Sequence, residues 1–206
     1  MKKLVMLMIA LMPLYAWAQD NTWERPEEEE TEVAKVKVNP DAKYLKGAVP
    51  EVDGKIVFAK TIEAPGKTAA QIYDIILAQM EKMTTEPNQI ANSNVAIKND
   101  EKHELGAVYH EWLVFKSSAL SLDRTQMNFQ LIVNCADGKA ALKMKHITYD
   151  YDMERKPQHY KAEEWITDKY CVNKKHTKLY PISGKFRRKT IDRKDFIFNK
   201  FESLLK

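Results

Sequence analysis

The middle of the chain contains two alternating segments that are joined by a tight-turn dipeptide. Residues 126–135 place an apolar side chain at every second position, which gathers these side chains on one face of an extended strand. Asp137-Gly138 follows, and this pair is favoured in two-residue hairpin turns. Residues 140–151 form a second alternating run. The sequence therefore predicts an antiparallel hairpin.

The second segment of this hairpin changes phase. Leu142 and Met144 are followed by Ile147 and Tyr149, so the apolar positions move from even to odd numbers. Because one inserted residue keeps such positions on a common face, we expect a β-bulge near Lys145.

Three other segments have the composition of strands, namely residues 55–63, 94–99 and 105–116. The last of them carries Val108, His110, Trp112 and Val114 on one face.

Helical spacing is found in three segments. Thr68 and Gln71 form a capping box before a helix. Its apolar face consists of Ile72, Ile75, Ile76, Met80 and Met83. Further helices are predicted over residues 158–172 and 190–205. This order predicts an α+β domain, in which an antiparallel sheet packs its helices on one face.

Four short motifs occur in a fixed order along the chain. They are Gly54-Lys55-Ile56-Val57-Phe58, Ile62-Glu63-Ala64-Pro65-Gly66-Lys67, Gln71-Ile72-Tyr73-Asp74 and Lys185-Phe186-Arg187-Arg188-Lys189-Thr190-Ile191-Asp192. With them, residues 50–206 resemble an exported bacterial family of unknown function that is described as having a TBP-like fold.

The resemblance implies a β-α-β-β-β-β-α layout, with residues 153–180 as an insertion before the final helix. It implies no catalytic residues, because no activity is assigned to the family. The name of the fold refers to a DNA-binding protein, but a fold does not determine function. We therefore expect no nucleic-acid partner for an exported chain.

The first eighteen residues have the features of a cleavable secretory signal. Lys2 and Lys3 precede an apolar run, and Ala16-Trp17-Ala18 fits the cleavage pattern. Because this run is too short to span about 30 Å of hydrocarbon, we expect cleavage after Ala18 and no transmembrane segment. The expected location is the periplasm or the extracellular space.

Charge is distributed unevenly along the rest of the chain. Residues 19–32 contain seven acidic residues and one arginine, a net charge of −6. They predict a solvated leader over residues 19–50, whose later part docks on a domain formed by residues 51–206. Residues 174–194 carry a net charge of +8.

Three interpretations of this basic stretch are open. In the first, it is a solvated connector. In the second, it is a surface that binds an envelope protein, an anionic glycan or a lipid head group. In the third, it is a docking site for the acidic leader of the same chain or of another copy. The candidate contact residues are Lys174, Lys175, Lys185, Arg187, Arg188 and Lys189.

No motif predicts a catalytic residue, a metal or a cofactor. The five histidines lack the spacing of zinc ligands, although strands can bring His110 and His146 together. The run of Asp150, Asp152 and Glu154 resembles a calcium loop, but Arg155 stands where such a loop requires glycine.

Two further questions stay open at this point. Cys135 and Cys171 are either a disulfide or two separate thiols. An aromatic group, which is either a sugar-stacking surface or part of the core, consists of Trp112, Trp165, Tyr149 and Tyr151.

Export, a one-sided sheet and the missing catalytic motifs favour a non-catalytic exported binding or interaction module of the bacterial envelope. An envelope glycan hydrolase and a self-associating structural protein are the alternatives.

Overall fold

The computed structural model describes residues 39–119 and 121–206, so the expected signal and the acidic part of the leader lie outside the described residues. Seven strands form an antiparallel sheet in the order β1-β2-β6-β5-β4-β3, and β7 pairs with β6. The strands are β1 (Glu51–Val52), β2 (Lys55–Glu63), β3 (Asn94–Asn99), β4 (Glu104–Ser118), β5 (Ser121–Ala136), β6 (Lys139–Tyr151) and β7 (Gln158–Lys161).

The predicted central hairpin is confirmed, and so is its bulge. Asp137-Gly138 joins β5 to β6, and Gly138 has a φ of 75°. Asn128 pairs with Thr148 but Gln130 pairs with Lys145, so two residues of β6 lie opposite one residue of β5. These two residues, 146 and 147, separate two parts of β6: residues 139–145 pair with β2, whereas residues 148–151 pair with β7.

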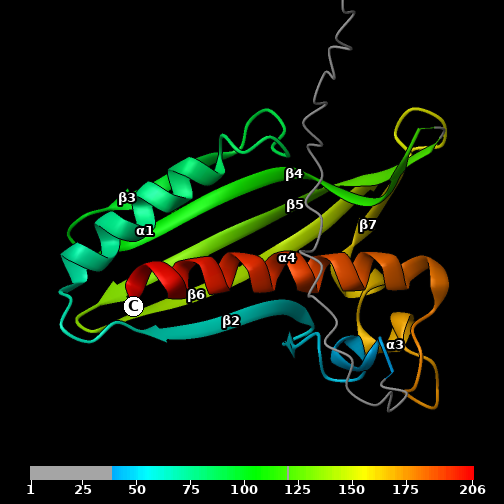
Figure 1. Ribbon diagram of the computed structural model, residues 1–206, viewed down its shortest axis with the longest axis horizontal. Coiled ribbons are helices and arrows are strands. Elements are labelled where there is room, and N and C mark those ends of the chain that lie inside the picture. The colour runs from blue at the N-terminus through cyan, green and yellow to red at the C-terminus, as the bar shows by residue number, and fades with distance from the viewer. Residues whose placement is uncertain (1–38, 120) are drawn as a thin grey trace, which may run out of the picture.

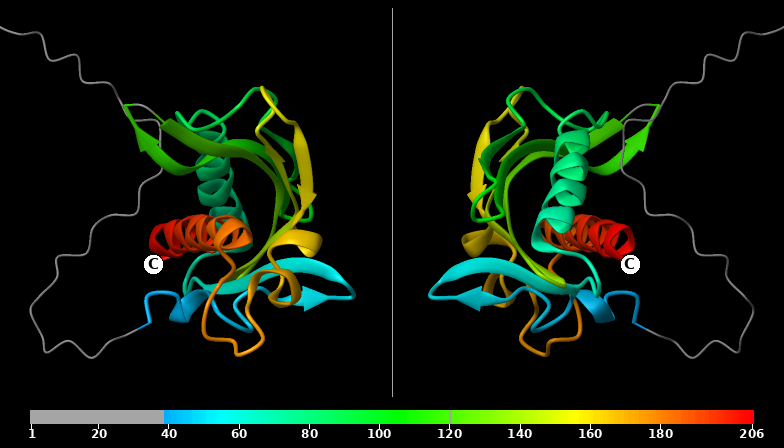
Figure 2. Two further views of the ribbon diagram at one scale, coloured as in Figure 1. Left: turned by 90° about the vertical axis from the view of Figure 1, so that its right-hand side faces the viewer. Right: turned by 90° about the vertical axis from the view of Figure 1, so that its left-hand side faces the viewer.

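Both long helices pack on the same side of the sheet, as predicted. Figure 2 shows that the sheet curves around α1 (Ala69–Met83) and α4 (Pro181–Leu205), which lie in its concavity. The predicted capping box of Thr68 and Gln71 is present. The inner face of the sheet and the two helices form one core, to which β5 contributes Met127, Phe129, Leu131 and Val133.

The predicted helix over residues 158–172 is wrong. Residues 158–161 form β7, which extends the sheet by pairing Tyr160 with Tyr149. Two single turns of helix follow, α2 (Ala162–Trp165) and α3 (Asp168–Cys171). The predicted apolar face of Ala162, Trp165, Ile166 and Tyr170 is thus divided between these two turns, and Trp165 stacks on Tyr160 of β7 with ring centroids 3.9 Å apart.

The last helix begins nine residues earlier than expected. Pro181 occupies its first turn, where the missing N–H of proline costs nothing. The basic residues 185–189, which were interpreted as part of a connector, therefore lie on α4 (Figure 1).

Residues 39–50 pack against α4 (Figure 1). They include the 3-10 helix η1 (Ala42–Tyr44). Tyr44 is buried, and its hydroxyl donates to Asp192 at 2.8 Å.

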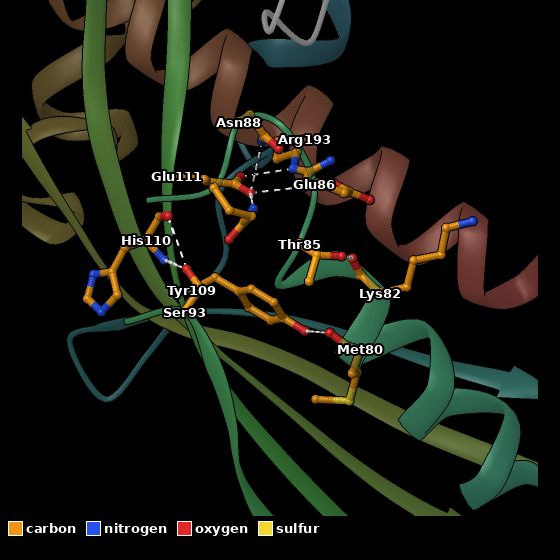
Figure 3. A network of polar contacts seen from close by, with 11 residues as sticks. Met80, Lys82, Thr85, Glu86, Asn88, Ser93, Tyr109, His110, Glu111 and Arg193 are labelled. Atoms are coloured by element: carbon orange, nitrogen blue, oxygen red, sulfur yellow. Dashed lines mark hydrogen bonds and ion pairs between the residues drawn. The ribbon is translucent and has the colours of Figure 1, made fainter. Parts of the chain in front are cut away.

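A buried ion pair links the helix layer to the sheet (Figure 3). Arg193 of α4 donates from Nε and Nη2 to the two carboxylate oxygens of Glu111, each at 2.9 Å. Nη2 also reaches Glu86, just after α1, at 2.9 Å. The three elements are therefore joined by one charged cluster.

No helix of the described part is long and apolar enough to cross a membrane.

Candidate functional site

The outer face of the sheet carries two parallel rows of polar and aromatic side chains, because the long helices cover only the inner face. β4 alternates so that Tyr109 and Leu113 point inward while His110 and Trp112 are half-buried on the outer face. The same alternation on β5 and β6 continues the rows across the sheet.

The register of four strands places these residues directly beside one another. One row consists of Trp112, Gln126, Asp150 and His159. The neighbouring row consists of His110, Asn128, Thr148 and Lys161. We call these eight residues the outer platform.

Asn128 is the central connection of the outer platform. Its Oδ1 accepts from Gln126 Nε2 at 2.8 Å and contacts His110 Nδ1 at 2.7 Å. Its Nδ2 donates to Asp150 Oδ2 at 2.9 Å and to Thr148 Oγ1 at 3.2 Å. Because both donors and both acceptor positions of the amide are used, the orientation of Asn128 is fixed.

These contacts also assign the protons of two histidines. The Oδ1 atom of Asn128 is an acceptor, so His110 must donate from Nδ1. His159 Nδ1 lies 2.5 Å from the Asp150 carboxylate and must donate for the same reason. In the neutral tautomer each ring then presents Nε2 as an acceptor, which makes these atoms candidate ligand contacts.

A cleft of about 370 Å³ opens at one end of the outer platform. Trp112 is one of its lining residues, and the Arg124 guanidinium lies 3.7 Å from the centroid of the Trp112 ring system. Leu122 and Met153 are exposed residues that also line the cleft. The other lining residues are Ser121, Asp123, Asp150, Tyr151, Asp152, Glu154 and Arg155.

Carboxylates outnumber cations along the cleft. Asp123 pairs with Lys185 at 2.7 Å, and Asp152 pairs with Arg155 at 2.9 Å. Asp150 is held by Asn128 and His159, as described above. Because the lining is net acidic, this cleft favours a neutral or cationic ligand over an anionic one.

A second cleft, of about 420 Å³, lies between β2 and α4. Lys60 and Lys194 are among its lining residues, and both are paired with neighbouring acids, Lys60 with Glu202 and Lys194 with Asp195. Lys194 also lies 5.5 Å from the ring centroid of Phe58. Since these cations serve contacts within the fold, we place the candidate site at the outer platform and treat this cleft as the competing location.

The six basic residues predicted to contact an anion do not form one surface, and this corrects the prediction. Arg187 is fully buried and donates to the backbone oxygens of Tyr44, Leu45 and Ile166. It also pairs with Asp168 at 2.6 Å. A side chain that is saturated inside the protein offers nothing to an external anion.

The other predicted anion contacts have separate positions. Arg188 forms a two-bond pair with Asp41 at 2.6 and 2.8 Å, and Lys185 pairs with Asp123 on the inner side of β5. Lys189 is half-buried on α4. Only Lys174 and Lys175 are exposed, in the turn between α3 and α4.

The histidines and cysteines that the sequence suggested as pairs also lie apart from each other. His146 contacts Gln130 at 2.7 Å, whereas His110 contacts Asn128, and the described residues contain no cluster of three or more metal-ligating side chains. Cys135 and Cys171 are separate buried thiols.

The proposed aromatic surface is divided between the two sides of the sheet. Tyr149 is buried, and Trp165 packs near Phe186 of α4, with ring centroids 5.8 Å apart. Trp112 alone lies on the outer platform. Sequence reasoning missed the platform because its members come from four strands; the cross-strand register that aligns them follows from the bulge and from β7.

Comparisons with known proteins agree with the fold. Residues 58–150 match a family described as a domain of unknown function (DUF4468) with TBP-like fold. A crystal structure of a DUF4468 family protein from Bacteroides ovatus is 44% identical, with a TM-score of 0.74, and the match covers 80% of this chain and 94% of that chain.

A TBP-like protein from Parabacteroides distasonis is 18% identical with a TM-score of 0.61, and the match covers 76% of this chain and 96% of that chain. At this identity the likeness concerns the fold alone. None of the curated proteins matches the chain.

Proposed function

Because the chain belongs to the DUF4468 family of domains with a TBP-like fold, whose function is unknown, we propose a function from its own surface: a non-catalytic, exported binding module of the bacterial envelope that holds a neutral oligosaccharide on the outer platform. The observation that carries this proposal is the ordered row of Trp112, Gln126, Asp150 and His159 on a sheet face that the long helices leave uncovered.

The chemistry of the platform suits a sugar. A pyranose ring has a C–H face that packs on an aromatic ring, and hydroxyl groups around its rim that exchange hydrogen bonds with amides, imidazoles and carboxylates. Trp112, whose ring also contacts the Arg124 guanidinium at 3.7 Å, supplies the aromatic surface beside polar groups that are already oriented. Since Asn128 and its partners are held in place before a ligand arrives, little side-chain freedom is lost on binding.

The compartment is part of the proposal. It is supported by the amino-terminal sequence, in which two lysines, a short apolar run and Ala16-Trp17-Ala18 have the pattern of a secretory signal. The periplasm or the extracellular space is also where a protein encounters the glycans of the envelope.

The test is calorimetric titration of the purified protein with neutral oligosaccharides of glucose, N-acetylglucosamine, mannose and galactose. Trp112→Ala and Asn128→Ala are each expected to weaken binding by about tenfold or more, since each removes about 1.4 kcal/mol or more of contact or preorganisation. Tyr170→Ala is the matched control, because Tyr170 is a 44% exposed aromatic residue outside the platform.

Two results would overturn this assignment. One is the absence of heat with every oligosaccharide of the panel. The other is binding that survives Trp112→Ala but is lost when the β2/α4 cleft is altered by Phe198→Ala.

Glycan hydrolysis is the second candidate, and one observation favours it: three acidic residues besides the internally paired Asp123, namely Asp150, Asp152 and Glu154, line the same cleft. Glycosidases commonly use two such groups on either side of the scissile bond. Incubation of the same oligosaccharides with the protein, followed by chromatography, separates the two functions. Cleavage that is lost in Glu154→Gln supports a hydrolase, whereas binding without products supports a binding module.

A further inference from the structure

The turn between α3 and α4 presents three lysines on an ordered backbone. Asn173 Oδ1 accepts from the backbone N–H groups of Thr177 and Lys178, at 2.8 and 3.1 Å. The backbone N–H of Asn173 in turn donates to the Lys178 carbonyl at 3.0 Å. We call the exposed Lys174, Lys175 and Lys178 of this turn the basic turn.

The basic turn has no acidic partner in the part of the chain that the structure describes: none of its three lysines forms an ion pair there. The neighbouring acids have other partners. Asp168 pairs with Arg187, and Asp41 pairs with Arg188. The turn is therefore a concentration of positive charge that the rest of the described fold does not neutralise.

The amino-terminal end of the described chain lies directly beside this turn. Asn39 Nδ2 donates to the backbone oxygen of Thr177 at 2.8 Å, between Lys175 and Lys178 in sequence. The following residues are fixed as well, since Asp41 is held by Arg188 and Tyr44 by Asp192. Asn39, the first residue that the structure describes, is therefore anchored next to the basic turn.

The chain that precedes Asn39 carries the opposite charge. Residues 19–32 have a net charge of −6, and Glu27, Glu28, Glu29 and Glu30 are consecutive. Only residues 33–38 separate Glu32 from the anchored Asn39, and a connection of this length spans at most about 25 Å. The acidic residues are thus tethered within reach of the lysines.

We propose that the acidic segment of residues 20–32 docks in cis on the basic turn. A short tether gives the segment an effective concentration of about 1 mM, so that even weak attraction fills the site. Docking covers the lysines with carboxylates and withdraws them from lipid head groups or acidic proteins. Displacement of the segment exposes them. This surface is separate from the outer platform, so the inference does not depend on the oligosaccharide proposal.

Carbodiimide cross-linking tests the inference, because this reagent joins a carboxylate to an amine only where the two are in contact. The purified protein is used at low salt, and linked peptides are identified by mass spectrometry in the monomer fraction. Links from Glu27–Glu32 to the basic turn are expected to exceed links to the exposed Lys116, Lys139 and Lys143 by at least about fivefold. In about 1 M salt the preference is expected to disappear, because screening then shortens the range of attraction to about 3 Å.

A charge-matched pair of variants provides the control. Lys174→Glu, Lys175→Glu and Lys178→Glu together are expected to raise the rate at which a glutamate-specific protease cuts residues 27–30 by about fivefold or more, roughly 1 kcal/mol of lost protection. The same three changes at Lys116, Lys139 and Lys143 alter net charge equally and are expected to leave the rate unchanged. Circular dichroism verifies that both triple variants fold.

The inference fails if links from the acidic segment are spread evenly over exposed lysines, or if both triple variants change the proteolysis rate alike. Links that occur only in covalent dimers would also contradict docking in cis, and would assign the segment to a second copy of the chain.

Discussion

The guanidinium of Arg193, on α4, donates a hydrogen bond to each carboxylate oxygen of Glu111, which is fully buried in the middle of β4. Asn88 and Gln89 add hydrogen bonds to the same carboxylate, at 3.3 and 2.8 Å (Figure 3). The carboxylate of Glu111 is therefore held from two segments, α4 and the loop of residues 88–89, and the ion pair with Arg193 positions the last helix over the sheet.

We predict that Glu111→Gln destabilises the protein by about 3 kcal/mol, since it leaves the buried Arg193 guanidinium without its main counter-charge. Urea unfolding followed by circular dichroism measures the effect. Glu86→Gln is the control, because the Glu86 side chain is 26% exposed and the loss is expected to be about 1 kcal/mol or less. Equal losses in the two variants would contradict this role for Glu111.

Gly184 is required by a close contact at the start of α4. A Cβ atom at this position would lie 2.9 Å from Leu179 Cβ, which cannot rotate away. We predict that Gly184→Ala destabilises the protein by about 1 kcal/mol, because overpacking exceeds the gain in helix propensity.

Gly106→Ala serves as the comparison for thermal unfolding. Its new Cβ would lie 3.0 Å from Cδ1 and 3.2 Å from Cβ of Ile97, so both contacts are longer than the one at Gly184, and Ile97 is 52% exposed on the edge strand β3 and has room to shift. A larger loss at Gly106 than at Gly184 would contradict the packing argument.

The ionisation of Glu202 makes part of the folding stability dependent on pH. Hydrogen bonds from Lys60 and Lys206 lower the pKa of Glu202 from 4.5 to about 2. Because the folded-state pKa is depressed, the stabilisation is present above the unfolded value and is lost as pH falls from 4.5 towards about 2.

Glu202→Gln is therefore expected to have a lower melting temperature than the wild type near pH 6, and the difference is expected to vanish by about pH 2. Melting curves at several pH values provide the measurement. A difference that stays constant with pH would show that the charge of Glu202 is not responsible.

The two cysteines are predicted to be unreactive thiols in the native state. Burial raises the pKa of Cys135 to about 11 and also raises the pKa of Cys171, so the reactive thiolate is scarce at neutral pH. Iodoacetamide is expected to modify neither residue in the folded protein and both in denaturant without reductant. Failure to modify them in denaturant would instead indicate a disulfide.

Features set by local pattern were predictable from the sequence. The Asp137-Gly138 turn, the bulge near Lys145 and the Thr68 cap depend on neighbouring residues, and all three are present. The one-sided placement of α1 and α4 followed from the alternation of the strands.

Features that depend on distant contacts were not predictable in this way. Tyr160 lies in a strand because β6 offers an edge for pairing beyond the bulge. Arg187 is buried because residues 44–45 and 166 bring backbone carbonyl groups to its guanidinium. The basic residues of α4 were therefore interpreted as surface, and the outer platform, which requires the register of four strands, went unseen.

Oligosaccharide binding to the outer platform can be observed residue by residue in a nuclear magnetic resonance titration that follows the Trp112 indole N–H and the backbone amides of β4 to β7 as neutral oligosaccharides are added. Binding on the outer platform is expected to cause saturable shifts that centre on Trp112, Gln126 and Asp150 and that are absent in Trp112→Ala. Shifts centred on Phe58 and Phe198 in the β2/α4 cleft, or no shifts with any oligosaccharide, would contradict it.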